Sequence, residues 1–257
     1  MIFDFLLFPL YVCVAYIFGV GVLRACSKKI TAPDDDFPPF FYFIAAQLSV
    51  GFATVIWNFF YPVSSPVFII ILAAIFAVGC LRVRREDINT LLWAMYFAVL
   101  LVPVTATMEA GADAGLYHIP HQLLMRDEKV IFGLANLHSR FGSNSFVEYI
   151  SAPLWIGQYF KLLSYNMSLF IITLMMFLLQ MARSANPSIA AMGFITIIGL
   201  IINSNFDFNY TSTDTPTGVL FAMTFFYGAS LLLNKIKVTT RQLQIFFLMA
   251  FMCFACK

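Results

Sequence analysis

A chain of 257 residues that is 61% hydrophobic and only 11% charged has too little polar surface to cover a water-soluble globule of its size. Its formal net charge of +2 comes from lysines and arginines scattered along the chain, which excludes the clustered basic surface of a nucleic-acid-binding protein. The composition therefore predicts a membrane-embedded protein with no nucleic acid among its partners.

Apolar runs of about 17 to 25 residues have the length that crosses a hydrocarbon core of about 30 Å. The first run lacks both a basic start and a cleavage site of small residues, so we expect a retained span and not a signal peptide. The runs predict an all-α fold, a polytopic transmembrane helix bundle of about eight spans that forms a single membrane domain over residues 1–257. They cover residues 2–24, 39–60, 66–83, 90–107, 166–182, 187–203, 217–234 and 242–256.

Lysine and arginine residues near the ends of these runs predict the orientation, because such residues are retained on the cytoplasmic side during insertion. They follow the first, third, fifth and seventh runs and are missing after the second and sixth. This alternation predicts a multi-pass protein with its N-terminus outside, and it places the loops 107–165 and 204–216 together on the outer face. The residues concerned are Arg24, Lys28, Lys29, Arg82, Arg84, Arg85, Arg183, Lys235, Lys237 and Arg241.

All five cysteines fall within apolar runs or at their ends, which implies no disulfide framework. Cys253 and Cys256 have the spacing of a redox or metal pair, but no second pair accompanies them, and we interpret them as small apolar residues of the last run. Because that run ends next to Lys257 without a polar tail, we expect the chain to be partial.

The long loop 107–165 carries most of the side chains that are able to do chemistry. It contains all three histidines, together with several acids and cations, and loops of this length inside a compact protein are usually functional. The loop is therefore the predicted functional site. Its ionisable residues are Glu109, Asp113, His118, His121, Arg126, Asp127, Glu128, Lys129, His138, Arg140, Glu148 and Lys161.

A turn flanked by Gly111 and Gly115 holds Asp113 just beyond the fourth run, and Tyr117 and His118 follow it. Next comes a predicted short helix on the membrane surface, because a proline suits the first helical turn and apolar residues recur at helical spacing. The residues of this pattern are Ile119, Pro120, Leu123 and Leu124.

His118 and His121 lie beside the N-terminus of this predicted helix, where an anion such as a lipid phosphate would be stabilised. Two other interpretations remain open from sequence alone. Asp113 and the histidines would equally serve as a turn cap and as interfacial side chains, and His118, His121 and an acid would also suit a divalent metal.

Further along the loop, Asn136, His138, Arg140 and Asn144 form a glycine-punctuated stretch whose side chains hydrogen-bond well to sugar hydroxyls or phosphate oxygens. A solvated turn before the next helix would have a similar composition. On the second outer loop, Asp214 stands two residues before Pro216, which suits either an N-cap of the seventh span or a second functional acid.

These residues resemble the GT-C superfamily of membrane glycosyltransferases, in which an outer loop begins with an acid soon after a span and then forms membrane-surface helices. Asp113 followed by the run 117–120, Tyr-His-Ile-Pro, is similar to the corresponding run of some glucosyltransferases in that class. The whole stretch 113–144, with the later 212–216, more closely resembles poorly characterised bacterial GT-C-like proteins of surface polysaccharide loci.

The resemblance implies that residues 90–257 form an incomplete GT-C-like module with outer loops 107–165 and 204–216, preceded by three further spans in residues 1–89. The chain has a single acid, Asp113, where many members of the superfamily have an acidic pair. The implied localisation is the bacterial inner membrane, with the active loop on the periplasmic or extracellular face.

The implied activity is transfer of a sugar from a polyprenyl-phosphate carrier to a glycan or lipid acceptor, in synthesis of an envelope polysaccharide or glycoconjugate. Asp113 would be the general base, with Asp214 as a second acid, and Arg126, Lys129 or Arg140 would neutralise the departing lipid phosphate. Tyr117, His118, His121, Asn136, His138 and Asn144 would complete the substrate site. No cofactor is required by this pattern, and a divalent metal is compatible with it.

A flippase or other transporter component of an envelope polysaccharide pathway is the alternative, together with an inactive fragment. Transporters place ionisable groups near the bilayer midplane on broken helices. Apart from Asp4, the predicted spans have almost none, which favours chemistry at the outer surface.

Overall fold

The computed structural model describes residues 3–26, 37–111, 114–137, 145–157, 159–202, 212–233 and 238–256. Within these ranges the chain is all-helical and contains no β-strand. The predicted all-α fold is therefore confirmed.

Each of the eight predicted apolar runs forms a helix, and the observed ends lie within three residues of the predicted ones. By length and composition, α1, α2, α4, α8 and α10 are able to cross a membrane, whereas α3, α9 and α11 have 17, 16 and 16 residues. The structure thus supports five candidate spans, and the count of eight stays a prediction. The helices are α1 (Asp4–Cys26), α2 (Pro39–Asn58), α3 (Pro66–Arg82), α4 (Asp87–Thr107), α8 (Leu163–Ala182), α9 (Pro187–Ile202), α10 (Asp214–Leu233) and α11 (Thr240–Ala255).

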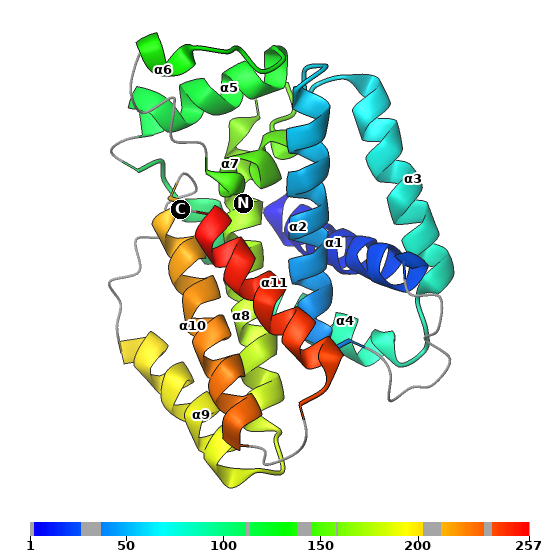
Figure 1. Ribbon diagram of the computed structural model, residues 1–257, viewed down its shortest axis with the longest axis vertical. Helices are drawn as coiled ribbons and strands as arrows, with labels where there is room; N and C mark the ends of the chain where they lie inside the picture. The colour runs from blue at the N-terminus through cyan, green and yellow to red at the C-terminus, as the bar shows by residue number, and fades with distance from the viewer. Residues whose placement is uncertain are drawn as a thin grey trace.

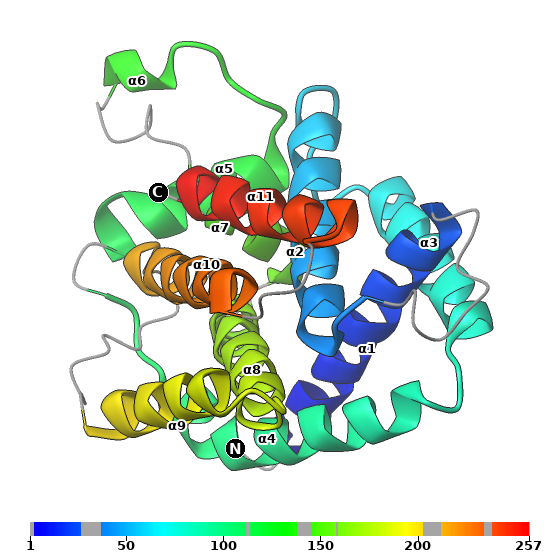
Figure 2. The same ribbon diagram turned by 60° about the horizontal axis from the view of Figure 1, so that its bottom comes forward.

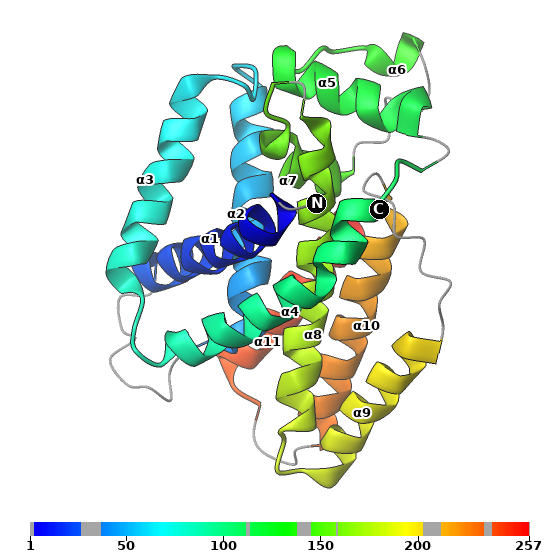
Figure 3. The ribbon, with the colours of Figure 1, turned by 180° about the vertical axis from the view of Figure 1, so that it is seen from behind.

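In Figure 1, α2, α8 and α10 run along the long axis of the molecule, and α11 crosses in front of them. From behind, α1 and α4 cross the same helices obliquely (Figure 3), so the bundle is closed on both sides. α3 packs mainly on α1, and α9 packs on α8 and α10, as the view in Figure 2 also shows. Buried aromatic side chains such as Phe8, Tyr16, Phe40 and Phe177 fill the space between them.

The described ends of α1, α3 and α8 and the start of α11, which carry predicted cytoplasmic cations, lie away from the short helices of the long loop (Figure 1), and we call this part of the bundle the basic end. Lys28, Lys29, Lys235 and Lys237 lie outside the described residues. At the basic end, the guanidinium of Arg24 at the end of α1 donates to both carboxylate oxygens of Asp87, at 2.7 and 3.0 Å, and to the carbonyl of Arg82 at 2.9 Å. Both ionised side chains are buried, so each compensates the desolvation of the other. On the other side of this end, Asn186 donates to the carbonyl of Leu233.

The surface of the bundle is strongly apolar, as expected of helices that face lipid. Ile70 is 65% exposed and Leu81 is 85% exposed on α3, and Leu232 and Phe254 are each 84% exposed. None of the five cysteines forms a disulfide, which agrees with the sequence interpretation.

Candidate functional site

The long loop folds into short helices that cover the end of the bundle opposite the basic end, which we call the loop end (Figure 1). Its described elements are the π-helical turn η2 (Ala114–His118), α5 (Ile119–Asp127), α6 (Leu134–Leu137), α7 (Phe146–Ser151), and the 3-10 turns η4 (Ala152–Leu154) and η5 (Phe160–Leu162). Pro120 stands in the first turn of α5, as the sequence predicts.

α5 is fastened to the end of α2 through backbone carbonyls at its C-terminus. The side-chain amide of Asn58, the last residue of α2, donates to the carbonyls of Met125 and Glu128, both at 2.9 Å. The backbone N–H groups of Val63 and Ser64 donate to the carbonyls of Met125 and Arg126. These bonds satisfy carbonyls that a helix end leaves without partners, and they fix α5 across the bundle.

The face of α5 that packs on the protein is not formed by the residues of its predicted apolar stripe. His121, Gln122 and Met125 are buried against the protein, whereas Leu123 is 38% exposed. His121 turns inward because α7 lies beneath α5 and offers it a carboxylate, whereas this carboxylate does not explain the buried Gln122, whose amide oxygen has no partner among the described residues. Ile119, Leu123 and Leu124 of the predicted stripe are not buried, which is compatible with the predicted helix on the membrane surface.

Glu148 of α7 is that carboxylate, and it joins the two histidines. Its Oε1 lies 2.5 Å from Nδ1 of His118, and its Oε2 lies 2.6 Å from Nδ1 of His121. The three side chains are only 4 to 12% exposed. We call this buried group the histidine cluster.

Burial alone would raise the pKa of Glu148. The hydrogen bonds from His118 and His121 and the charge of both rings together lower the pKa by more than burial raises it, so it lies below its usual value of 4.5. The carboxylate is therefore ionised at neutral pH and accepts a hydrogen from each Nδ1. In a neutral imidazole this places the lone pair on Nε2, which then acts as an acceptor or a base. The same arrangement of a carboxylate behind a histidine orients catalytic bases.

α7 holds Glu148 in position, and Ser145 anchors the start of this helix. Ser145 caps the helix by accepting from the N–H of Val147, and its hydroxyl also donates to the carbonyl of Cys256 at 2.5 Å. Phe146 packs in the main hydrophobic core against α2. Every residue of α7 is buried, so Glu148 has little freedom to move.

Arg126 lies near this cluster on the last turn of α5, where it is held by several contacts. Its Nε and Nη2 donate to the two carboxylate oxygens of Asp127, at 2.6 and 2.7 Å, and its Nη1 donates to the carbonyl of Gly157 at 2.6 Å. The guanidinium also stacks over Trp155 at 5.0 Å. The predicted phosphate ligand is thus fixed in orientation.

The other predicted site residues are distributed around this region. The ring of Tyr117 lies 4.1 Å from that of His118. Lys129 is exposed just after α5, and Asn136 is exposed on α6. Asp113, His138, Arg140 and Asn144 lie outside the described residues.

Asp214 is the first residue of α10 and is exposed, so it stands inside the first helical turn and not at the predicted N-cap. The hydroxyl of Ser212 instead accepts from the N–H of Thr215, at 3.3 Å, which is the bond expected of a cap. An acid in the first turn still interacts favourably with the helix dipole.

The sequence did not predict that Glu148 is the partner of the two histidines. In sequence, Ser145 and Glu148 have the spacing of a capping box, which accounts for a glutamate at this position without any further role. Twenty-seven residues separate His121 from Glu148, and no local pattern links them. Only the packing of α7 against α5 brings them together.

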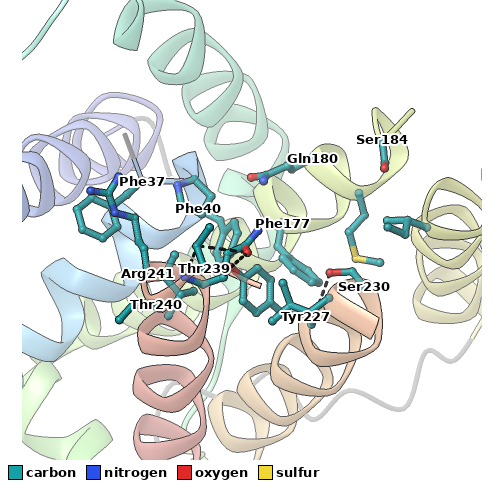
Figure 4. A pocket seen from close by; sticks show the side chains of 16 residues that line it. Phe37, Phe40, Phe177, Gln180, Ser184, Tyr227, Ser230, Thr239, Thr240 and Arg241 are labelled. Carbon is teal, nitrogen blue, oxygen red and sulfur yellow. Dashed lines mark hydrogen bonds between the residues drawn. The ribbon is translucent and has the colours of Figure 1, made fainter. Parts of the chain in front are cut away.

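A cavity of about 740 Å³ opens at the basic end between α2, α8, α10 and α11 (Figure 4). Phe37, Phe177, Tyr227 and Arg241 are among its walls, and Arg241 lies over the ring of Phe37 at 5.0 Å. Among the described residues that line it there is no histidine or acid, and none of the predicted site residues.

Among the residues that the structure describes, no three side chains of histidine, cysteine or acid are arranged to hold a metal ion. In the histidine cluster, ring nitrogens contact carboxylate oxygens directly.

A family model described as a domain of unknown function, DUF8201, matches residues 1–257. No curated protein and no solved structure matches the chain.

Proposed function

We propose that this chain, which belongs to the DUF8201 family, is a membrane glycosyltransferase that moves a sugar from a polyprenyl-phosphate carrier to an acceptor at the loop end of the bundle. The observation that carries the proposal is the histidine cluster. A buried carboxylate that orients two imidazoles is costly to build in an otherwise apolar molecule, and such perturbed groups concentrate at functional sites.

Position supports the same proposal. The cluster lies on η2, α5 and α7 at the loop end of a bundle in which five helices are able to cross a membrane, and exposed apolar residues of α5 and its neighbours would face lipid. A lipid-linked donor reaches such a site from the bilayer, and a polar acceptor reaches it from water. The proposed orientation places this end on the periplasmic or extracellular side.

Asp113 is the proposed general base, which takes the proton from an acceptor hydroxyl as that hydroxyl attacks the anomeric carbon. It precedes η2, so His118 and His121 follow it by five and eight residues. In this scheme the imidazoles contact the sugar or the phosphate through Nε2 while Glu148 holds their Nδ1 atoms. Arg126 neutralises the lipid phosphate that departs.

The test is an in vitro transfer assay with purified full-length protein in lipid nanodiscs and a panel of radiolabelled polyprenyl-phosphate sugars. Transfer that depends on Asp113 and on the histidine cluster is the expected result. If a folded preparation transferred no sugar from any donor to any acceptor of the panel, the proposal would be wrong.

A transporter role is the second candidate, and the 740 Å³ cavity at the basic end is the observation that favours it. Its aromatic and hydroxyl-bearing walls suit a sugar or a lipid head group. A flippase would move a fluorescent lipid-linked sugar across proteoliposomes without any change in the sugar. Movement without transfer would favour this second candidate.

A further inference from the structure

Two cavities adjoin where α1, α2 and α3 meet the segment 152–157. The helix cavity, of about 380 Å³, is walled mostly by apolar side chains of the three helices and η4, together with Ile150 of α7 and Leu169 of α8. The head cavity, of about 300 Å³, lies at the start of α3 and includes Arg126 and Trp155. Ile69, Leu72 and Pro153 line both cavities, so the two share a wall.

Two residues with polar groups line the helix cavity, Tyr11 of α1 and Gln47 in the middle of α2. Gln47 is only 2% exposed, and neither its amide nitrogen nor its amide oxygen has a hydrogen-bond partner within the described part of the chain. A buried amide without partners is unfavourable, so its presence points to a ligand that fills the cavity beside it. Gln47 is eleven residues from the end of α2, or about 16 Å along the helix.

The head cavity offers a cation with hydrogens left to donate. A guanidinium has five N–H groups, and the described contacts of Arg126 to Asp127 and Gly157 use three. One N–H on each terminal nitrogen remains, in a plane that Trp155 and Gly157 hold fixed. Two N–H groups on adjacent nitrogens match two oxygens of a phosphate.

We propose that the two cavities form one binding site for an isoprenoid phosphate, with its phosphate at Arg126 and its chain passing Leu72 toward Gln47. This site rests on the proposed function, since its ligand is the lipid part of the donor. The helix cavity is near the lower limit of small-molecule pockets, about 300 Å³, so it accommodates one chain and not the two of a diacyl lipid.

Gln47 gives the chemical reason for an isoprenoid chain. Such a chain carries a double bond in every unit, so one lies beside Gln47 wherever the chain rests. The π face of a double bond accepts the amide N–H, and its C–H groups contact the amide oxygen, both weakly. A saturated chain offers no acceptor to the N–H.

The experiment is photolabelling of the full chain in nanodiscs by a diazirine-bearing isoprenoid phosphate, followed by mapping of the labelled residues. Competitors are polyprenyl phosphate, polyprenol, a saturated alkyl phosphate of equal length and a diacyl phosphatidic acid. We expect labels on α1, α2 and α3, with polyprenyl phosphate as the strongest competitor. Leu72→Trp places a larger side chain in the wall that the two cavities share, so it should lower labelling at least about fivefold. Ile70→Trp should not lower it, because the side chain of Ile70 is 65% exposed on α3.

Two further variants each test one chemical feature of the ligand. In Arg126→Ala, polyprenyl phosphate should lose its advantage over polyprenol, because the cation is gone. In the wild-type protein, the weak contacts of Gln47 should make polyprenyl phosphate about a two- to fivefold stronger competitor than the alkyl phosphate. In Gln47→Leu, this difference should disappear. Arg126→Ala and Gln47→Leu should leave the total yield of folded protein unchanged by size-exclusion chromatography.

Labels that map away from these helices, or equal labelling of wild type and Leu72→Trp, would overturn the site. Equal competition by phosphatidic acid would also overturn it, in favour of a general lipid pocket. If the wild-type protein were labelled specifically at this site but transferred no sugar, the result would count against the proposed function alone. Transfer activity with no specific labelling would count against this site alone.

Discussion

Phe146 of α7 lies directly against Gly51 of α2. A Cβ atom added at Gly51 would come within 2.4 Å of Cζ of Phe146, far inside a van der Waals contact. Phe146 and Glu148 share the same short helix, so this contact sets the depth at which α7, and with it the carboxylate of the histidine cluster, rests on the bundle.

Gly51→Ala is therefore expected to displace α7 and to disturb the cluster from a distance. Overpacking costs about 1 to 3 kcal/mol, which exceeds the gain from replacing a helical glycine by alanine. Thermal unfolding and transfer activity should both fall. Gly218→Ala in α10 is the matched control, because a Cβ there meets nothing within 4 Å, and its unfolding temperature should stay equal or rise.

Glu148→Gln should destabilise the protein by about 1 to 3 kcal/mol at neutral pH, since the amide NH₂ faces one of the two Nδ1 hydrogens and leaves it without an acceptor. The pKa of Glu148 in the folded state lies below 4.5, so the carboxylate contributes its full stability above that pH. This contribution is lost as the pH falls through the folded pKa. Chemical denaturation of both proteins at several pH values should show curves that separate at pH 7 and converge in acid, and a constant separation would contradict the assignment.

Asp113→Asn should lower the rate of transfer by at least about a hundredfold, because general-base help is typically worth about 10² to 10⁴. Asp214→Asn should lose far less, since Asp214 is exposed in the first turn of α10 and Ser212 already supplies the cap bond there. Single-turnover assays at saturating donor give the comparison. Loss of activity in the second variant alone would exchange the two roles.

Arg126→Ala should reduce donor use by about ten- to hundredfold, the loss expected when a charge-assisted contact worth about 1.5 to 3 kcal/mol disappears. Lys129→Ala should have a small effect, because Lys129 is exposed and contacts between surface charges are weak. Arg140→Ala tests the remaining predicted ligand. The measurement is the dependence of the transfer rate on donor concentration, and wild-type behaviour in all three variants would exclude these cations.

Cysteines introduced singly at Ser143 and Thr211, in a variant without the native cysteines, should react with an impermeant thiol reagent from outside the cell. One at Thr239, next to the basic-end cavity, should react only after permeabilisation. Labelling of Thr239→Cys from outside would reverse the orientation, and with it the side on which transfer is proposed.

The sequence by itself determined the helices. Their starts and ends follow from where apolar runs stop, since a bilayer requires runs of a certain length and helices satisfy their own backbone hydrogen bonds. Pro120 marked the start of α5 for a similarly local reason. The starts of α4, α8 and α10 were predicted about three residues late, because polar residues such as Asp87 continue a helix beyond its apolar part.

The tertiary structure decided which polar groups meet. His121 and Glu148 are far apart in sequence, and His121 faces inward on α5 because α7 supplies a carboxylate beneath it. Arg24, which reads in sequence as one more cytoplasmic cation, is a buried partner of Asp87. Periodicity records which residues avoid water, but a charged pair or a hydrogen-bonded cluster depends on the directions of side chains from separate helices, and these are fixed only when the helices pack.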